Sequence, residues 1–144
     1  MNGIKIRNVR LDDAASTARL VTQLGYATTD LEMKERLGGI LPEPNYMTFV
    51  AEHEAEVVGM LGVGVFRYYE RNGVYGRLLT LVVDEKRQRR GIGAALVAAG
   101  ESWLRERNAK AVIVNSGKHR AEAHRFYENL GYLETGVRFV KGLS

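Results

Sequence analysis

Cysteine is absent from the 144 residues of this chain, proline occurs only twice, and no apolar run approaches the ~20 residues that a membrane-spanning helix needs. The lack of cysteine excludes a disulfide framework and a thiolate nucleophile, and it fits a reducing compartment. Residues 1–7 alternate in polarity as a strand does and do not resemble a signal peptide. We therefore expect a cytoplasmic protein that does not bind a membrane.

The chain has only a small excess of charge of one sign. Its 21 basic and 17 acidic residues give a formal net charge of +4 and a pI near 9.5. This excess suits an acidic small ligand but is modest for a nucleic-acid binder, so we expect no nucleic-acid partner. The hydrophobic share of 45% and the charged share of 26% are typical of a soluble globular protein. With no repeat, linker or low-complexity segment, residues 1–144 are predicted to form a single domain.

The chain has three histidines, at His53, His119 and His124. None of them has the i, i+4 spacing or the carboxylate partners of a zinc site. We expect surface histidines and no bound metal.

Apolar periodicity predicts an alternation of strands and helices. The predicted strands cover residues 4–9, 47–53, 57–69, 74–84, 111–114 and 132–141. The predicted helices cover residues 11–24, 30–37, 91–107 and 120–130. The three strands at residues 47–53, 57–69 and 74–84 follow one another as antiparallel neighbours, so the sheet is predicted to be mostly antiparallel.

Turn and capping residues punctuate these elements. Thr29 followed by Glu32 matches a capping box at the start of the second helix. Gly38-Gly39 and the two prolines after it predict a break in the chain. The Asn72-Gly73 pair predicts a type I′ hairpin turn, and Gly131 is predicted to cap the last helix.

Residues 78–96 are the most informative stretch, because a strand runs through a basic, glycine-containing turn directly into a helix. The first N–H groups of a helix lack intrahelical partners and carry partial positive charge, so a phosphate binds there with little reorganisation. Gly91 and Gly93 allow close approach of the backbone. Four cations around the same turn favour a pyrophosphate over a single carboxylate. They are Lys86, Arg87, Arg89 and Arg90.

A Gly-x-Gly turn alone is equally compatible with a structural strand-to-helix connection. Leu96 stands where a dinucleotide fingerprint needs its third glycine, and Ala94-Ala95 stands where a Walker A loop needs Lys-Ser/Thr. The remaining motif, Gln88-Arg89-Arg90-Gly91-Ile92-Gly93, resembles the Gln/Arg-x-x-Gly-x-Gly/Ala pyrophosphate loop of the GCN5-related N-acetyltransferase (GNAT) family. In that family the loop binds coenzyme A.

A second motif lies in residues 120–132, where Ala123, Phe126-Tyr127 and Gly131-Tyr132 resemble the family pattern Ala-x-x-Phe-Tyr-x-x-x-Gly-Phe/Tyr. The sequence departs from the family at Arg120, because many members carry Asn at that position. That cofactor hydrogen bond is therefore not transferred to Arg120, and Asn115 is a candidate to supply one instead. By periodicity alone, Tyr127 belongs to an apolar helical stripe and only packs.

The resemblance implies an α/β (α+β) fold, with a mixed, mostly antiparallel sheet of six to seven strands that splays open at the cofactor site and is flanked by about four helices. It also implies acetyl-CoA as cosubstrate and Tyr127 as the catalytic acid that protonates the departing thiolate, since a phenol with a pKa near ~10 stays protonated at neutral pH. The cofactor-binding residues that it implies are Leu81, Val82, Val83, Gln88, Arg89, Arg90, Gly91, Ile92, Gly93, Ala94, Asn115 and Tyr127.

The chemistry that the resemblance implies is direct attack of a neutral amine on the thioester in a ternary complex. The base that deprotonates the amine is open among Glu52, Glu70, Asp84 and water, and each carboxylate is expected to be solvated surface rather than catalytic. The loop at residues 38–46 and the aromatic Phe66, Tyr68 and Tyr69 are candidates for the acceptor pocket.

We expect an acetyl-CoA-dependent N-acetyltransferase whose acceptor is the primary amine of a small molecule. Acetylation of a protein N-terminus or lysine, and a non-catalytic acyl-CoA-binding module, are the alternatives. The predicted strands at residues 132–141 offer an edge for a homodimer.

Overall fold

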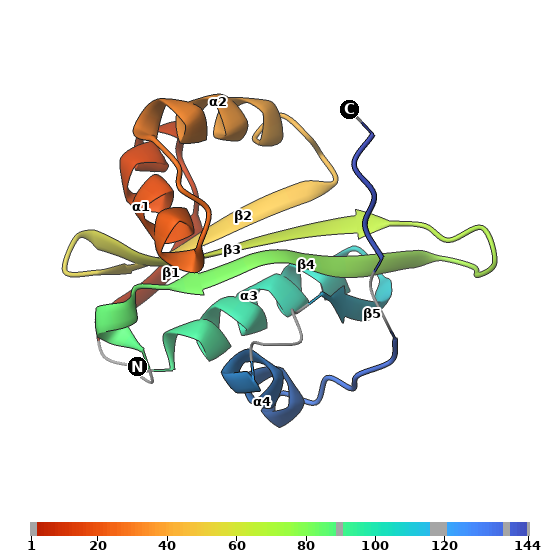
Figure 1. Ribbon diagram of the computed structural model, residues 1–144. Helices are drawn as coiled ribbons and strands as arrows, with labels where there is room; N and C mark the ends of the chain where they lie inside the picture. Colours follow the sequence, from red (N-terminus) through yellow and green to blue (C-terminus); the bar gives the residue numbers. More distant parts are fainter. Residues whose placement is uncertain (1–2, 89–90, 116–120, 137–138, 144) are drawn as a thin grey trace. The chain divides into compact units, whose positions relative to one another are not determined.

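The computed structural model describes residues 3–88, 91–115, 121–136 and 139–143 (Figure 1). The chain divides into two compact units, Met1–Ile113 and Val114–Ser144, and each is described by itself. The single domain over residues 1–144 stays a prediction.

A five-stranded sheet forms the centre of the first unit, with the strands in the order β1-β2-β3-β4-β5. Each of the pairs β1–β2, β2–β3 and β3–β4 is antiparallel. The strands are β1 (Ile4–Asn8), β2 (Tyr46–His53), β3 (Glu56–Phe66), β4 (Val74–Val83) and β5 (Ala109–Val114). The predicted fold class is confirmed, but the described residues form five strands rather than six or seven.

Helices cover both faces of this sheet. The helices α1 (Ala14–Leu24) and α2 (Asp30–Ile40) lie on one face, and α3 (Ile92–Glu106) lies on the other (Figure 1). Short 3-10 turns precede α1 and α3, as η1 (Leu11–Asp13) and η2 (Glu85–Arg87). The second unit contains α4 (Ala121–Asn129), so the described residues hold the four predicted α-helices.

The apolar stripes of α1 and α2 pack on the sheet and form one side of the core. This cluster consists of Val9, Ala14, Ala18, Leu20, Met33, Leu37, Val50, Val57, Met60 and Val82. The removal of these apolar side chains from water is the main force that holds the two helices on the sheet.

Glycines bring α3 close to the opposite face. A Cβ atom on Gly76 of β4 would lie 2.6 Å from a methyl carbon of Leu104, and one on Gly100 would lie 2.7 Å from a methyl carbon of Leu61. Real Cβ contacts are longer than this, so the helix and the sheet approach each other more closely than side chains at these positions would allow.

The predicted break at Gly38-Gly39 is wrong, because α2 continues through both glycines to Ile40. Each glycine weakens a helix by only about 1 kcal/mol relative to alanine. Burial of Met33 and Leu37 stabilises the helix against that cost. The helix ends before Pro42, where the prolines do terminate it as expected.

The type I′ turn occurs at a different place from the one predicted. Asn72-Gly73 lies in a longer connection over residues 67–73, and Asn72 has no positive φ. The β2–β3 hairpin turns instead at Glu54 and Ala55, whose φ angles of 51° and 64° are both positive, as a type I′ turn requires. Tight hairpin geometry at this position therefore overrides the preference for asparagine and glycine.

The closing strands predicted at residues 132–141 are wrong for the residues that the structure describes, 132–136 and 139–141; residues 137–138 lie outside them. The apolar side chains here, Leu133, Phe139 and Val140, are exposed. A strand needs a ladder partner and a buried face, and exposed side chains do not supply that face. The homodimer that was predicted from this edge stays a prediction.

Candidate active site

The turn between β4 and α3 is shaped by its own hydrogen bonds. The Gln88 side-chain amide donates to the Val83 carbonyl oxygen at 2.8 Å. Asp84 follows β4; its backbone N–H donates to the Val58 carbonyl at 2.8 Å, and its carboxylate accepts from the Lys86 N–H at 3.2 Å. Asp84 is only 6% exposed, so the expectation that it is solvated is wrong. Its carboxylate caps η2 and fixes the entry to the turn.

The N-terminus of α3 has no side-chain cap. Gly91 adopts φ 75°, a left-handed conformation that glycine reaches without steric cost, and it stands at the N-cap with no side-chain cap. The first intrahelical bond runs from the Ala95 N–H to the Gly91 carbonyl at 3.0 Å. The N–H groups of the first turn, on Ile92, Gly93 and Ala94, are therefore unpaired within the helix. This turn carries no acidic residue, and its partial positive charge suits a phosphate.

Two of the four predicted cations of the turn are described. The Arg87 guanidinium pairs with the Glu56 carboxylate at 3.3 Å, which directs it toward the start of β3. Lys86 is exposed. Arg89 and Arg90 lie outside the described residues.

The residues predicted to contact the extended arm of the cofactor, Leu81, Val82 and Val83, lie at the end of β4. Val82 is buried in the α1–α2 core, whereas Leu81 and Val83 are half-buried. Upstream, the β3–β4 register shifts between Gly62 and Val63, because Gly62 pairs with Thr80 while Val63 pairs with Leu78. Leu79 is thus the extra residue of a β-bulge. The interior glycines of the facing strand, Gly59, Gly62 and Gly64, are typical of a bulge or a close backbone approach, but they do not locate the extra residue at Leu79.

Asn115 and Tyr127 belong to the second unit, and the other predicted site residues belong to the first. Asn115 is exposed just after β5. Tyr127 lies in α4, half-buried, with its ring 5.3 Å from the Phe126 ring and 5.7 Å from the Tyr132 ring. Its carbonyl accepts the Tyr132 N–H at 3.0 Å across the Gly131 cap. Both the packing and the catalytic interpretation of Tyr127 are compatible with this geometry.

The candidate base Glu52 is engaged elsewhere. Its carboxylate accepts from Arg7 Nε at 2.8 Å, and the same guanidinium binds both carboxylate oxygens of Asp13 at 2.9 Å. Burial raises the pKa of the Asp13 carboxyl, but hydrogen bonds from Arg7 and from the Arg10 N–H outweigh it and hold the pKa below its ordinary value. This network ties β1 and β2 to the start of α1 and gives Glu52 a structural role.

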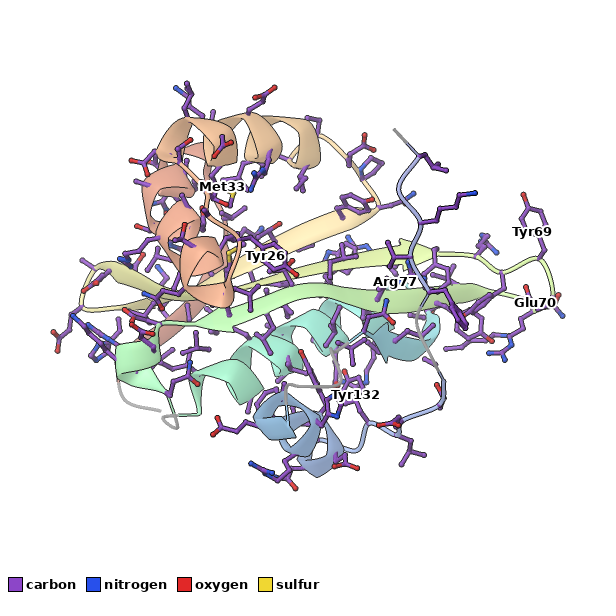
Figure 2. The ribbon with its side chains drawn as sticks, in the orientation of Figure 1. Tyr26, Met33, Tyr69, Glu70, Arg77 and Tyr132 are labelled. Atoms are coloured by element: carbon purple, nitrogen blue, oxygen red, sulfur yellow. The ribbon has the colours of Figure 1, made fainter. Side chains whose placement is uncertain are left out.

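An aromatic cluster forms at the far end of β3 and β4. The Phe66 ring lies 5.0 Å from the Tyr68 ring, which lies 4.9 Å from the Tyr75 ring. Tyr69, expected beside them, is fully exposed and lies with Glu70 at the tip of the hairpin (Figure 2). Sequence reasoning thus found two of the three rings and missed Tyr75, which alternation along β4 could have indicated.

The described residues show neither a metal-binding cluster nor a membrane-spanning helix. Within the described ranges, no group of three or more His, Cys, Asp or Glu residues is placed to hold a metal ion. His119 lies outside those ranges, and the His53 side chain is half-buried beside Glu54 rather than exposed. None of the described helices has the length and apolar character that crossing a membrane requires.

Comparisons with known proteins agree with this geometry. The model of the acetyltransferase (GNAT) family matches residues 14–132. The chain is 28% identical over 141 residues to an aminoalkylphosphonate N-acetyltransferase of Salmonella typhimurium, a match that covers 96% of this chain and 91% of the relative. It is 26% identical, with a TM-score of 0.81, to an aminoglycoside acetyltransferase from an uncultured soil metagenomic sample in complex with sisomicin, covering 99% and 98% of the two chains. An aminoglycoside N-acetyltransferase in complex with CoA shares the fold, with a TM-score of 0.86 at 17% identity, covering 98% of this chain and 95% of that one.

Proposed function

The chain belongs to the acetyltransferase (GNAT) family and is therefore an acyltransferase, and from that premise we propose that it transfers the acetyl group of acetyl-CoA to the primary amine of a small molecule. The observation that carries this proposal is the N-terminus of α3, which no side chain caps and which presents unpaired N–H groups at the end of β4. A relative named for aminoalkylphosphonates and a structural neighbour that holds sisomicin support a small amine as acceptor. The neighbour in complex with CoA supports the cofactor.

In this proposal, the cofactor lies along β4 and ends at α3. The pyrophosphate accepts hydrogen bonds from the N–H groups of the first turn of α3 and from the loop before it. The main chain at the end of β4 pairs with the pantetheine arm as an added strand would. The proposed cofactor contacts are Leu81, Val82, Val83, Gln88, Arg89, Arg90, Gly91, Ile92, Gly93, Ala94, Asn115 and Tyr127.

The reaction is one direct transfer. The neutral amine attacks the thioester carbonyl, and a backbone N–H stabilises the resulting oxyanion. The C–S bond then breaks, the amide forms, and the thiolate takes a proton from the Tyr127 hydroxyl. The amine loses its proton to water or to a carboxylate, for which Glu52 is disfavoured by its pairing with Arg7.

Release of free CoA tests the proposal. Purified protein is mixed with acetyl-CoA and a panel of aminoalkylphosphonates, polyamines, aminoglycosides and peptides, and the thiol is titrated. We expect release with at least one small amine and a product heavier by one acetyl group in mass spectrometry. Turnover of peptides alone would favour the protein-acetylating alternative, and acetyl-CoA binding without turnover of any amine would favour the non-catalytic one.

Replacing Tyr127 by phenylalanine tests the acid. If the hydroxyl protonates the thiolate, kcat falls by ~10²–10⁴-fold while acetyl-CoA affinity stays constant. Tyr132→Phe is the matched control, because Tyr132 also packs in this aromatic group and has no proposed chemical role. A fully active Tyr127→Phe enzyme would remove the catalytic assignment and leave the cofactor site intact.

A further inference from the structure

On the sheet face that carries α1 and α2, glycines replace larger side chains in the second half of β3. The core under those helices ends at Met60 of β3 and Val82 of β4, and the β3–β4 hairpin extends beyond them (Figure 1). On the same face of β3, the next two positions are Gly62 and Gly64. A Cβ on Gly62 would meet nothing closer than the Leu79 Cβ at 3.8 Å, and one on Gly64 would meet the Tyr46 ring at 3.1 Å. The backbone therefore leaves room for a ligand above Gly62, whereas the Tyr46 ring covers Gly64 and borders that space.

The bulge at Leu79 decides which side chains of β4 border this floor. Thr80 pairs with Gly62 and Arg77 pairs with Gly64. Directly paired residues share a face, so Thr80 and Arg77 lie on the same face although they are an odd number of residues apart. Without the bulge, one of them would point toward α3.

Arg77 is held in place but lacks an acidic partner. Its guanidinium carbon lies 4.5 Å from the centre of the Phe66 ring. Its Nε is buried and makes no hydrogen bond, and within the described ranges no carboxylate pairs with this side chain. A buried donor without an acceptor destabilises the protein, and an arginine whose plane is already stacked is pre-organised for a bidentate anion.

A second guanidinium adds positive charge nearby. Arg71 lies 5.1 Å from the centre of the Tyr68 ring and 5.9 Å from that of Tyr75, and it too forms no ion pair with a described carboxylate. Glu70, its neighbour in sequence, projects at the hairpin tip, whereas Arg77 lies back along β4 (Figure 2). Arg71 and Arg77 therefore lie against the aromatic cluster, and no described carboxylate neutralises their charge.

The position of Arg77 along β4 relates it to the reaction. With the pyrophosphate at Gln88–Gly93 and the arm along Val83 and Leu81, the acetyl group comes next in line, beside the bulge. Arg77 lies two to four residues further, or ~7–13 Å at the rise of an extended strand. The arginine side chain can shorten this span toward the acceptor.

We propose that Arg77 binds an anionic group of the acceptor, so that the preferred substrates are primary amines that carry a phosphonate, phosphate or carboxylate. This inference rests on the proposed function and narrows it. Polycationic amines such as aminoglycosides would meet like charge at Arg77 and Arg71 and are disfavoured acceptors.

The test compares acceptors that differ only in the anion. Aminoalkylphosphonates of increasing chain length, the matching amino carboxylates and the matching amino alcohols are assayed with saturating acetyl-CoA. We expect kcat/KM to be ~10-fold or more higher for the anionic amines, with the phosphonate and carboxylate series showing which anion fits better. A preference for the amino alcohols or for polyamines would overturn the inference while leaving the proposed function standing.

Variants locate the effect. Arg77→Met keeps the apolar stem over Phe66 but removes the donors, and it should lower kcat/KM for the best anionic amine by ~10–100-fold, chiefly through KM, with less than ~3-fold change for the amino alcohol. Arg77→Lys should restore part of the loss.

Arg67→Met removes an exposed arginine after β3 and is the charge-matched control. Equal losses on both acceptors, or equal effects of the Arg67 variant, would overturn the assignment. Absence of turnover with every amine in the folded wild type would overturn the proposed function and this inference together.

Discussion

The N-termini of α2 and α3 are built in opposite ways. At α2, the Glu32 N–H donates to the Thr29 hydroxyl at 3.1 Å and the Thr29 N–H donates to the Glu32 carboxylate at 2.9 Å, with Asp30 adding a second acid. At α3, Gly91 provides no side chain and the first turn holds no acid. The first terminus satisfies its own donors, and the second leaves them unpaired within the helix, where we propose that the cofactor binds. The absence of a side-chain cap at the start of a helix is therefore the feature that points to an anion-binding role.

The largest effect is expected from Gly91→Val, which replaces a left-handed glycine by a β-branched residue that rarely adopts this conformation. Acetyl-CoA affinity measured by calorimetry should fall by ~100-fold. Gly25→Val is the matched control, because Gly25 also has positive φ but ends α1; it should lower stability without changing affinity. Unchanged affinity in a folded Gly91→Val protein would remove the loop from the site.

A smaller effect is expected when α3 is given the acid that α2 has. Ala94→Glu places a carboxylate at the third position of the helix, as Glu32 stands in α2. Repulsion of the pyrophosphate should weaken acetyl-CoA binding by ~10-fold, while the helix dipole should raise the free energy of unfolding by ~0.5 kcal/mol. Ala94→Gln is the neutral control. Tighter cofactor binding by the glutamate variant would contradict an anion site here.

The reverse change, Thr29→Ala, removes the cap of α2. It should lower the free energy of unfolding by ~1 kcal/mol in denaturant titrations, with no change in acetyl-CoA affinity or kcat. Thr28→Ala, at the neighbouring position, serves as control. A loss of cofactor affinity in Thr29→Ala would break the distinction between a structural and a functional helix start.

The smallest effect concerns pH. Hydrogen bonds from the Thr29 backbone N–H and hydroxyl hold the pKa of the Glu32 carboxyl below its ordinary value. A group whose pKa is lower in the folded state stabilises the protein above its unfolded pKa, and that contribution is lost as the pH falls through the folded pKa. Glu32→Gln should therefore have a lower Tm than the wild type at neutral pH, and the difference should narrow below about pH 4. A difference that does not depend on pH would exclude the carboxylate as its source.

Sequence patterns predicted most of the fold because each element was marked locally. The Thr29 and Glu32 box, the positive-φ Gly131 and the alternation in β2 to β4 all depend on neighbours in the chain. The failures at Gly38-Gly39 and at residues 132–141 arose where distant packing decides whether a segment keeps its structure. Local propensity does not contain that information.

For the candidate site, the sequence marked the β4–α3 turn but not what surrounds it. The Gly-x-Gly motif singled out Gly91, which the structure places at the N-cap of α3 with a positive φ. The pairing of Glu52 with Arg7 joins residues 45 positions apart, and the Leu79 bulge depends on the register of two strands. Because a single sequence gives neither this ion pair nor the strand register, the base stayed open among Glu52, Glu70, Asp84 and water, and Arg77 was overlooked.

The close contact between Gly76 and Leu104 couples the C-terminal end of α3 to the sheet, so a change at this end can displace the whole helix. Its 15 residues form a rod that is ~22 Å long, and this contact lies near the end remote from Gly91. A bulkier residue at position 76 would push the C-terminal end of α3 away from the sheet. The helix would then tilt, and its N-terminal turn would be displaced. We therefore expect the affinity of the proposed cofactor site to depend on position 76, which is not among the proposed cofactor contacts.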